Sequence, residues 1–219
     1  MQEKDLRDQV VEAMLTLDRD ALNRGSSGNV SVRFEDTMLI SPSGVPPENL
    51  TAKSIAKVSL SDADGAWEGD LRPSSEWRFH RDILNAKPEA QAIVHTHAEY
   101  STIVSILRRP IPAVHYMIAI FGGADIPLAP YARFGTQALS DGIIEALKNR
   151  LGCLMASHGM VVAGTDMKHA LWLANELEML ANQFYRVTLA GGGHILSDEE
   201  IQEVIAGMSE YGPVDVDAT

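Results

Sequence analysis

The chain has 219 residues, 45% hydrophobic and 22% charged, a composition typical of a globular protein that can bury a substantial core. Its formal net charge of −12, with no basic cluster, argues against nucleic acid and anionic membrane surfaces as partners. One cysteine excludes an intramolecular disulfide, and the absence of a signal-peptide core or of an apolar run near roughly 18 residues predicts a cytoplasmic protein without a membrane span.

The N-terminal third is predicted to form a helix followed by a small antiparallel sheet. Leu6, Val10 and Met14 recur at helical spacing and predict an amphipathic helix over about residues 3–23. After two turns that contain glycine, β-branched and alternating residues predict three short strands, the first two as a hairpin: residues 29–34, 37–41 and 56–60.

The rest of the chain is predicted to alternate helices with buried strands. Ser74 and Ser75 precede Glu76 as a serine cap precedes a carboxylate, so a helix is expected from there to about Asn85. A β-branched run predicts a buried strand that ends at residue 97, and two further strands flank a turn at residues 157–159. Helices are also predicted at residues 99–107, 136–150, 166–189 and 197–209, whereas residues 111–127 mix short extended and turn pieces. Without repeats or linkers, residues 1–219 are predicted to form one α/β domain.

Two histidines at the end of the buried strand, His95 and His97, form the first candidate for a metal site. In a strand, residues i and i+2 share a face roughly 6–7 Å apart, so both imidazoles can bind one ion. A third candidate ligand is His158, at a tight turn between apolar strands, and a fourth is Glu76, in the first turn of its predicted helix. Three imidazoles and a carboxylate suit Zn²⁺, and a single cysteine excludes a thiolate-rich zinc site.

Each of these residues also has an ordinary structural explanation. A lone histidine in a fold is usually structural, and Glu76 taken alone is better explained as a carboxylate that stabilises a helix N-terminus. The other four histidines have no partner at metal-ligand spacing, although the first of them follows Glu76 by four residues: His80, His115, His169 and His194.

Three turns rich in serine and glycine are candidate anion sites: Ser27–Gly28–Asn29, Ser43–Gly44 and Ser74–Ser75. Each leaves backbone N–H groups free to point at an anion, and the last lies at a predicted helix N-terminus, where the helix dipole favours a phosphate. None contains Lys or Arg, so neutral donors would hold the phosphate, which would let an acidic protein bind an anionic substrate. Taken singly, each is better explained as an ordinary turn or cap.

Together these motifs resemble the zinc-dependent class II aldolase and epimerase family. The resemblance covers nearly the whole chain and rests on motifs in matching order and spacing: GSSGNVSVR, SPSG, RPSSEWRFH, IVHTHA, IPAVHYMIA, APYARFGT, SHGMVVAG, ALWLANELEMLA and LSDEEI. It implies a three-layer α/β/α fold with a mainly antiparallel central sheet. It also implies a fourfold-symmetric homotetramer with active sites between subunits.

The resemblance implies a role for each matching residue. One Zn²⁺ per subunit would be held by His95, His97 and His158, with Glu76 as the fourth ligand in the resting site and the catalytic acid/base. The substrate phosphate would be held by Gly28, Asn29, Ser43, Gly44, Ser74 and Ser75. A neighbouring subunit would receive Tyr116 as the proton donor at the aldehyde oxygen, Tyr211 is a second candidate for that role, and Phe134 would line the aldehyde pocket.

The implied reaction is retro-aldol cleavage of a ketose 1-phosphate, of the L-fuculose 1-phosphate type, to dihydroxyacetone phosphate and a short aldehyde such as lactaldehyde. The C3–C4 bond breaks, Zn²⁺ acts as a Lewis acid, and Glu76 moves the proton at the enediolate carbon. The SSE and HYMIA motifs match the aldolases of the family, whereas its epimerases tend to carry Asp at position 76. The chain departs from the family where Ser26 and Ser43 replace a frequent Thr, and in its acidic tail after Tyr211, which bears on the aldehyde specificity.

Three alternatives stay open on the sequence alone. The same chemistry on 5-deoxyribulose 1-phosphate or 5-(methylthio)ribulose 1-phosphate, in a salvage pathway, shares the phosphate end and the bond broken, so the motifs do not separate it. A dehydratase or epimerase on the same scaffold is disfavoured by the SSE and HYMIA motifs. A non-catalytic assembly domain resembling that of adducin is disfavoured because such domains lose the metal ligands, whereas this chain keeps all four.

Overall fold

The computed structural model describes residues 2–208, so the predicted site residue Tyr211 lies outside the described part of the chain. The helices are α1 (Glu3–Arg19), α2 (Trp77–Ala86), α3 (Glu99–Ile106), α4 (Gln137–Ala146), α5 (Met167–Leu189) and α6 (Asp198–Gly207), with 3₁₀ turns η1 (Pro47–Asn49), η2 (Ala52–Ser54) and η3 (Tyr116–Phe121). The strands are β1 (Asn29–Phe34), β2 (Thr37–Ile40), β3 (Ala56–Ser59), β4 (Trp67–Glu68), β5 (Ala92–Thr96), β6 (Ile111–Pro112), β7 (Asp125–Ile126), β8 (Leu128–Ala129), β9 (Gly152–Met155) and β10 (Gly159–Gly164). No helix within residues 2–208 combines the length and apolar character needed to cross a bilayer.

The main sheet has β5 near its centre. Over the described residues its strand order is β4-β3-β2-β1-β5-β10-β9-β8, and every neighbouring pair is antiparallel except β8 and β9. The register places Asn29 of β1 on one side of His95 and Val161 of β10 on the other. The ends of three strands therefore meet where the HTH motif leaves the sheet.

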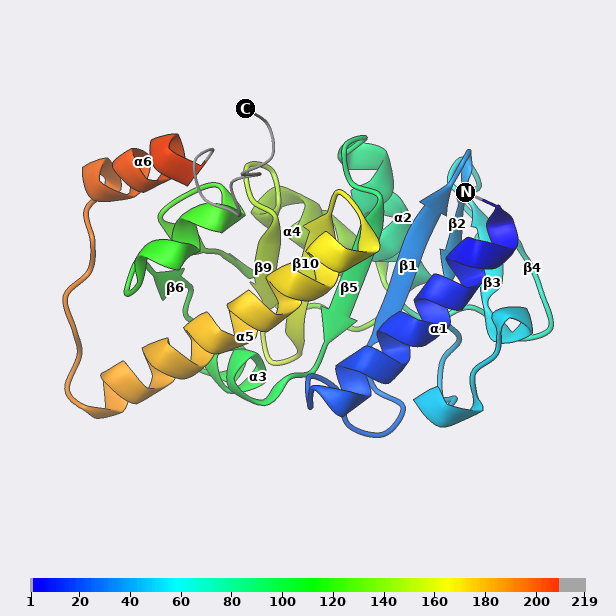
Figure 1. Ribbon diagram of the computed structural model, residues 1–219, viewed down its shortest axis with the longest axis horizontal. Helices are drawn as coiled ribbons and strands as arrows, with labels where there is room; N and C mark the ends of the chain where they lie inside the picture. The colour runs from blue at the N-terminus through cyan, green and yellow to red at the C-terminus, as the bar shows by residue number, and fades with distance from the viewer. Residues whose placement is uncertain (1, 209–219) are drawn as a thin grey trace, which may run out of the picture.

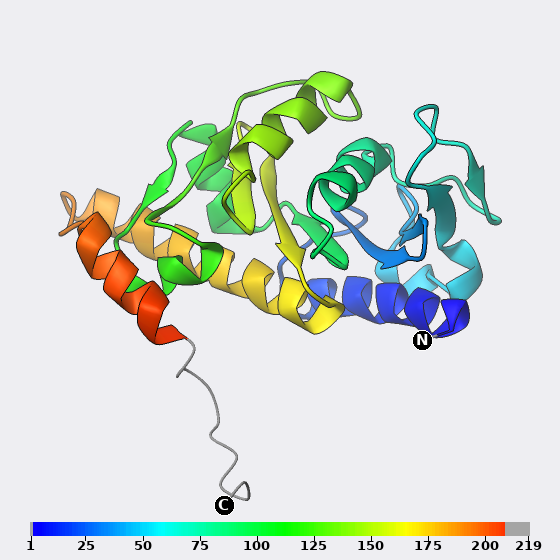
Figure 2. The ribbon, with the colours of Figure 1, turned by 90° about the horizontal axis from the view of Figure 1, so that it is seen from above.

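Helices cover both faces of this sheet. Figure 1 looks onto the face covered by α1 and α5, and Figure 2 shows the sheet lying between that pair and the helices α2 and α4. The arrangement confirms the predicted three-layer α/β/α fold with a mainly antiparallel central sheet.

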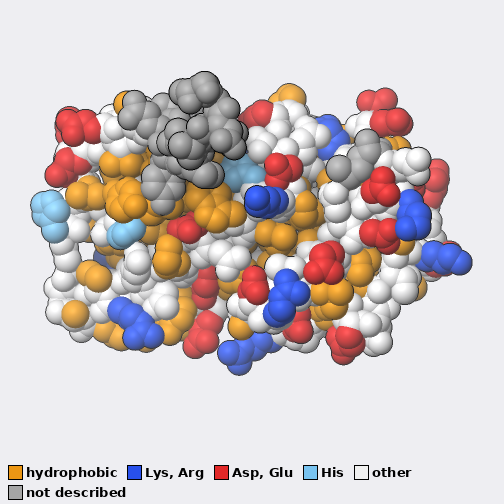
Figure 3. All heavy atoms as spheres, viewed as in Figure 1, with side chains coloured by type: hydrophobic (Ala, Val, Ile, Leu, Met, Phe, Trp, Pro, Cys, Tyr) orange, Lys and Arg blue, Asp and Glu red, His pale blue; other side chains and the backbone are white. Residues whose placement is uncertain are grey.

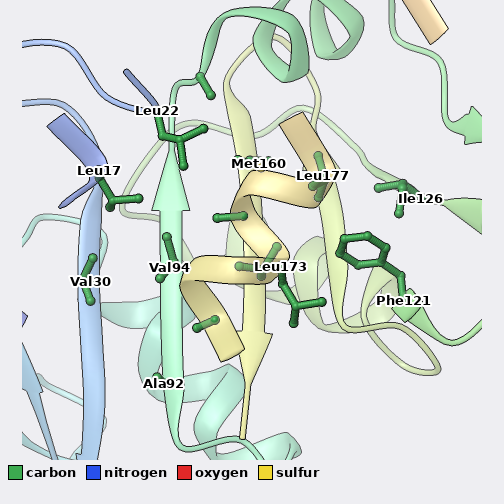
Figure 4. Packing of buried hydrophobic residues seen from close by; sticks show 14 of the residues in the cluster. Leu17, Leu22, Val30, Ala92, Val94, Phe121, Ile126, Met160, Leu173 and Leu177 are labelled. Carbon is green, nitrogen blue, oxygen red and sulfur yellow. The ribbon is translucent and has the colours of Figure 1, made fainter. Parts of the chain in front are cut away.

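Side-chain alternation along β5 decides which layer receives the first histidine. Ala92 and Val94 pack on the side of α1 and α5 (Figure 4), whereas Ile93 packs with Phe79 of α2 on the opposite side. Because side chains alternate, His95 shares the face of Ile93. Its ring meets the Phe79 ring edge-on, with centroids 5.5 Å apart. The buried strand thus delivers an imidazole to the beginning of α2.

Most predicted elements are present, but several boundaries differ. The predicted serine cap of α2 is wrong: the helix begins at Trp77, Glu76 is the N-cap residue, and the Ser74 hydroxyl accepts a hydrogen bond from the Glu76 backbone N–H. α1 ends at Arg19 because the chain turns at Ala21, with φ +57°, and buries Leu22. α4 ends at Ala146 rather than near residue 150, and residues 111–127 contain β6, η3 and β7.

Removal of a large core ring tests this packing. Phe121 is fully buried on the α5 side of the sheet (Figure 4). A Cβ built at Gly152 would lie 3.0 Å from its ring, so the ring packs closely against that glycine. We expect Phe121→Ala to lower the free energy of unfolding by about 3–5 kcal/mol, because the deletion removes apolar contacts and leaves a cavity. Urea denaturation measures the loss. The matched control is Phe134→Ala, whose ring is 59% exposed and whose removal should change stability by no more than about 0.5 kcal/mol.

Candidate metal centre and substrate pocket

Four potential metal ligands converge at the end of β5. Glu76 comes from the N-cap of α2, His95 from β5, His97 from the residue after that strand, and His158 from the turn between β9 and β10. One ligand atom from each side chain lies within 4.8 Å of all the others. The structure therefore brings together the residues predicted from the HTH, SSE and SHG motifs.

The three imidazoles are arranged with near-threefold regularity. Each pair of ring centroids, among His95, His97 and His158, is 4.9 Å apart, and the ring planes are inclined by 72–80°. The Nε2 atoms of His95 and His97 are 3.0 Å apart. The Glu76 carboxylate reaches the same centre, with Oε2 at 3.2 Å from His95 Nε2 and Oε1 at 3.3 Å from His158 Nε2.

This geometry fits a divalent cation. Ions bound tetrahedrally at 2.0–2.1 Å have ligand atoms about 3.3 Å apart. The three atom pairs given above are 3.0–3.3 Å apart, within a group that spans no more than 4.8 Å. Glu76 Oε1 is buried and lacks a hydrogen-bond partner, and such an oxygen is costly unless something compensates it. A donor set of three imidazoles and one carboxylate is that of a divalent transition metal rather than of calcium or magnesium.

Hydrogen bonds from neighbouring elements orient the ligands. His95 Nδ1 lies 2.7 Å from the Met160 carbonyl oxygen, an acceptor, so Nδ1 carries the proton and Nε2 faces the centre. The backbone N–H of His158 donates to Ser105 Oγ at the end of α3, and the preceding residue, Ser157, adopts φ +55°. The tight turn predicted between the two apolar strands is thus braced by α3.

Burial and mutual proximity shift the pKa values of these groups. Burial alone would raise the pKa of Glu76, but the charge and hydrogen bond of His95, with the charge of His158, hold it well below its ordinary 4.5. Burial, and next the charge of His95, lowers the pKa of His97 and of His158 to about 4. The Glu76 carboxylate outweighs burial at His95 and raises the pKa of that ring. At neutral pH, His97 and His158 are therefore neutral and able to donate lone pairs.

A pocket of about 450 Å³ opens directly beside this centre. Its lining includes three of the potential ligands, Glu76, His97 and His158. Most of the predicted anion-binding turns also line it, through Ser26, Ser27, Gly28, Asn29, Ser43, Ser74 and Ser75. The rest of the lining comes from the loop after β8 and from the residue before His158: Tyr131, Ala132, Arg133, Phe134 and Ser157. Two of the turns are joined, because the Ser75 backbone N–H donates to Ser43 Oγ at 2.9 Å. Three of the four potential metal ligands and most of the polar turns therefore line one cavity.

Two predicted site residues do not line the pocket, and a third falls outside the described part of the chain. Gly44 follows Ser43 with φ +73° but is not part of the pocket lining. Tyr116, at the start of η3, is 40% exposed and likewise does not line the pocket. Tyr211 lies beyond the described residues. The participation of these three residues stays a prediction.

Sequence reasoning missed two residues that the structure places at the site. Arg133 lines the pocket next to Phe134, so the cavity is not lined by neutral donors alone; its position in the RFGT motif was the available signal. His80 is fully buried behind Asn29, with its Nε2 2.5 Å from Asn29 Oδ1. Its helical i+4 spacing from Glu76 pointed to the site, but it contacts a neighbour of the carboxylate rather than the metal centre itself.

Fold and site define a class of protein, a metal-dependent aldolase. The sequence profile described as "Class II Aldolase and Adducin N-terminal domain" matches residues 8–185. The chain belongs to this family and is a class II aldolase enzyme. A curated relative, the L-fuculose phosphate aldolase of Escherichia coli K12, is 47% identical over 214 residues, which cover 97% of this chain and 98% of the relative.

A second curated relative and a solved structure are also similar to this chain. The 5-methylthioribulose-1-phosphate/5-deoxyribulose-1-phosphate aldolase of Rhodospirillum rubrum is 43% identical over 207 residues, covering 94% of this chain and 92% of the relative. A solved structure of an L-fuculose 1-phosphate aldolase superposes with a TM-score of 0.89 at 30% identity, covering 94% of this chain and 96% of that one.

Two glycines with similar backbone angles test how closely the polar turn approaches the metal centre. Gly25 and Gly28 have φ of +65° and +71°, but a Cβ at Gly25 would meet nothing within 4 Å, whereas one at Gly28 would lie 2.4 Å from Asn23 Nδ2 and 2.7 Å from the His95 carbonyl oxygen. We expect Gly25→Ala to cost about 1 kcal/mol of stability, from backbone strain alone. Gly28→Ala should cost about 1–3 kcal/mol more, because of overpacking.

Urea denaturation of both variants measures the difference, and metal affinity is measured in parallel. Only Gly28→Ala should weaken metal binding, since only there must the backbone of His95 shift. Equal losses of stability in the two variants would contradict the close approach of this turn to β5.

The pKa shifts predict how the stability of the metal-free protein depends on pH. The pKa is about 4 for His97 and His158, and burial, followed by the charge of His95, lowers that of His80 to about 3. In the unfolded chain these three imidazoles take up protons near pH 6.5, whereas in the folded chain they stay neutral down to about pH 4. The free energy of unfolding should therefore fall as the pH decreases from 6.5 toward 4. His95, with a raised pKa, acts in the opposite sense above pH 6.5. Urea denaturation across this range measures the slope, and a flat profile would contradict these shifts.

Proposed function

We propose that the chain catalyses zinc-dependent retro-aldol cleavage of a ketose 1-phosphate of the L-fuculose 1-phosphate type. The products would be dihydroxyacetone phosphate and a short aldehyde such as lactaldehyde. The observation that carries the proposal is one cavity whose lining combines serine and glycine turns with Glu76, His97 and His158, three members of the three-histidine, one-glutamate group. The 47% identity to an L-fuculose phosphate aldolase over almost the full length of both chains supports the choice of sugar.

We assign the metal to His95, His97, His158 and Glu76, with one Zn²⁺ per subunit. Neutral imidazole ligands leave the ion most of its positive charge, and when bound it supplies Lewis acidity toward the carbonyl and adjacent hydroxyl of the ketose. Zinc is favoured because the set contains three imidazoles and no thiolate.

In this proposal Glu76 is the acid/base that moves the proton at the enediolate carbon. Its two oxygens differ: Oε2 accepts a hydrogen bond from Asn29 Nδ2 at 3.0 Å, whereas Oε1 is buried without a hydrogen-bond partner. Oε1 is therefore the oxygen left to exchange a proton with substrate. General acid/base catalysis of this kind contributes about 10²–10⁴-fold to the rate.

The substrate phosphate is assigned to Gly28, Asn29, Ser43, Gly44, Ser74 and Ser75. The side-chain hydroxyl groups at these turns can donate to an anion without a large positive charge. The backbone N–H groups of Ser74 and Ser75 are already paired, with the Ser41 carbonyl oxygen and Ser43 Oγ. Arg133 lines the same pocket and brings one basic residue to it, which suits a phosphorylated substrate in a chain of net charge −12.

The aldehyde end is assigned to Phe134 and to tyrosines supplied by a neighbouring subunit. Phe134 lines the pocket and is 59% exposed, so its ring is available to an apolar aldehyde. Tyr116 and Tyr211 are the proposed proton donors at the leaving aldehyde oxygen. A homotetramer would bring Tyr116 to another subunit's pocket, which agrees with its exposure of 40% and its absence from its own pocket.

The surface supports assembly in the same way. Hydrophobic side chains gather over the α5 side of the molecule in Figure 3, and Trp172 and Met179 of that helix are 39% and 41% exposed. Exposed apolar area of this kind is typical of protein interfaces. We place the enzyme in the cytoplasm, where its free Cys153 stays reduced.

A second candidate keeps the mechanism and changes the aldehyde, with 5-deoxyribulose 1-phosphate or 5-(methylthio)ribulose 1-phosphate as substrate. It is favoured by the 43% identity to an aldolase of that name, over 94% of this chain. The two candidate substrates share the phosphate end and the bond that is broken. Their aldehyde ends differ, and we expect these ends to contact the pocket rim at Tyr131, Arg133 and Phe134.

A substrate panel tests the proposal. We expect kcat/KM to be highest for L-fuculose 1-phosphate among the 1-phosphates of fuculose, ribulose, deoxyribulose and methylthioribulose. Chelation should abolish cleavage and added Zn²⁺ restore it, while Glu76→Gln, a nearly isosteric change, should lower kcat by about 10²–10⁴-fold without unfolding the protein. Full activity after metal removal would refute the metal mechanism, and a preference for either deoxy sugar would select the second candidate.

A further inference from the structure

A buried chain of polar side chains leads away from the metal centre into the core. Ser31 Oγ lies 2.8 Å from His80 Nδ1, His80 Nε2 lies 2.5 Å from Asn29 Oδ1, and Asn29 Nδ2 lies 3.0 Å from Glu76 Oε2. Ser31 and His80 are 0% exposed, Asn29 is 3% exposed and Glu76 7%. Water therefore has little access to these groups, and each depends on its neighbour for its hydrogen bonds.

The chemistry of the groups determines the direction of every bond in this chain. A carboxylate only accepts hydrogen bonds, so the Asn29 amide must present its Nδ2 hydrogens to Glu76 and its Oδ1 to His80. An amide oxygen also only accepts, so His80 Nε2 must carry a proton. In the neutral ring Nδ1 is then an acceptor, and the Ser31 hydroxyl donates to it. All three hydrogen bonds point toward Glu76.

The charge state of His80 agrees with this assignment. Burial lowers the pKa of His80 to about 3, so the ring is neutral and carries a single proton at neutral pH. The ring is held in place by stacking on Phe79, with centroids 4.7 Å apart. One ring nitrogen thus serves as a fixed donor to Asn29.

We propose that His80 is a positioning residue, whose Nε2–H fixes the orientation of the Asn29 amide. This orientation determines which oxygen of Glu76 is hydrogen-bonded to Asn29 and which can bind the metal or a proton. Without this donor, the Asn29 amide can rotate and present its oxygen to the Glu76 carboxylate, which would be repulsive. With it, Asn29 anchors Oε2 and leaves Oε1 for the metal or a proton. The part of this inference that concerns catalysis rests on the proposed function of Glu76, whereas the part that concerns metal affinity does not.

Two substitutions at position 80 separate positioning from simple packing. His80→Phe keeps a flat ring beside Phe79 and removes both nitrogens, whereas His80→Gln keeps an N–H donor at a position close to that of Nε2. If His80 only fills space, Phe should replace it without loss of zinc affinity or kcat. If His80 positions Asn29, Gln should preserve zinc affinity and kcat, whereas Phe should not.

The experiment measures zinc affinity by competition with a chromophoric chelator, together with kcat and the melting temperature, for the wild type and each variant. We expect His80→Phe to lower zinc affinity and kcat by about 10–100-fold, as loss of a group that orients a metal ligand does, and His80→Gln to recover most of both. His194→Phe, at an exposed histidine outside the pocket lining, is the control and should change neither. Wild-type zinc affinity and kcat in a folded His80→Phe protein would overturn the proposal.

A double-mutant cycle tests whether His80 acts through Asn29. If it does, adding His80→Phe to Asn29→Ala should produce no further loss of zinc affinity, because the intermediary is already gone. Fully additive losses would overturn this route. The comparison uses binding alone, so it remains decisive even if the wild type cleaves none of the ketose phosphates, a result that would refute the proposed function separately.

The wild type itself provides a test that does not depend on how the variants fold. The ¹⁵N spectrum of histidine-labelled protein reports the tautomer of each neutral ring. We expect His80 to be protonated at Nε2 near neutral pH. A proton at Nδ1 would reverse the direction of the chain and refute the assignment.

Discussion

The buried carboxylate of Glu76 is the constraint on which the rest of the site depends. A carboxylate held away from water costs several kcal/mol unless opposite charge and hydrogen bonds compensate it. Three imidazoles and the Asn29 amide surround this one, yet Oε1 still lacks a hydrogen-bond partner. A cation at the common centre satisfies that oxygen and the three imidazole lone pairs together. The position of Glu76 as the N-cap of α2, rather than inside the helix, lets its side chain turn back toward β5.

Hydrogen bonds from neighbouring helices hold the segments that carry the proposed metal ligands. Helix α3 begins two residues after His97. The backbone N–H groups of Tyr100 and Ser101, in the first turn of α3, donate to the Glu178 carboxylate of α5 at 2.7 and 2.8 Å. At the other end of α3, Ser105 accepts hydrogen bonds from the backbone of the turn that carries His158. One short helix therefore spaces two of the imidazoles, and α5 fixes that helix on the sheet. Ligands supported in this way stay close to the geometry that a metal requires.

The pocket reconciles an acidic chain with an anionic substrate. The chain carries a net charge of −12, yet its pocket is lined by several serines and by one basic residue, Arg133. Neutral donors attract a phosphate at short range without requiring an excess of basic residues, and Arg133 adds a charge at the rim. Three of the proposed metal ligands line the same cavity as the proposed phosphate turns, so a substrate with its phosphate at those turns would have its carbonyl within the same pocket as the metal.

The sequence by itself determined the fold class, the family and the four residues that meet at the centre, because motif spacing and hydrophobic alternation are local properties that survive folding. Alternation along β5 was enough to place His95 on one face. Only the tertiary structure decided which element caps α2, that Arg133 enters the pocket, and that His80 stands behind Asn29. The place of His80 depends on contacts with Asn29 and Ser31, about 50 positions away in the chain, which side-chain spacing along a single helix or strand cannot report. The spacing of four positions from Glu76 to His80 can be read from the sequence. What connects the two side chains is Asn29 of β1, which only folding places beside both of them.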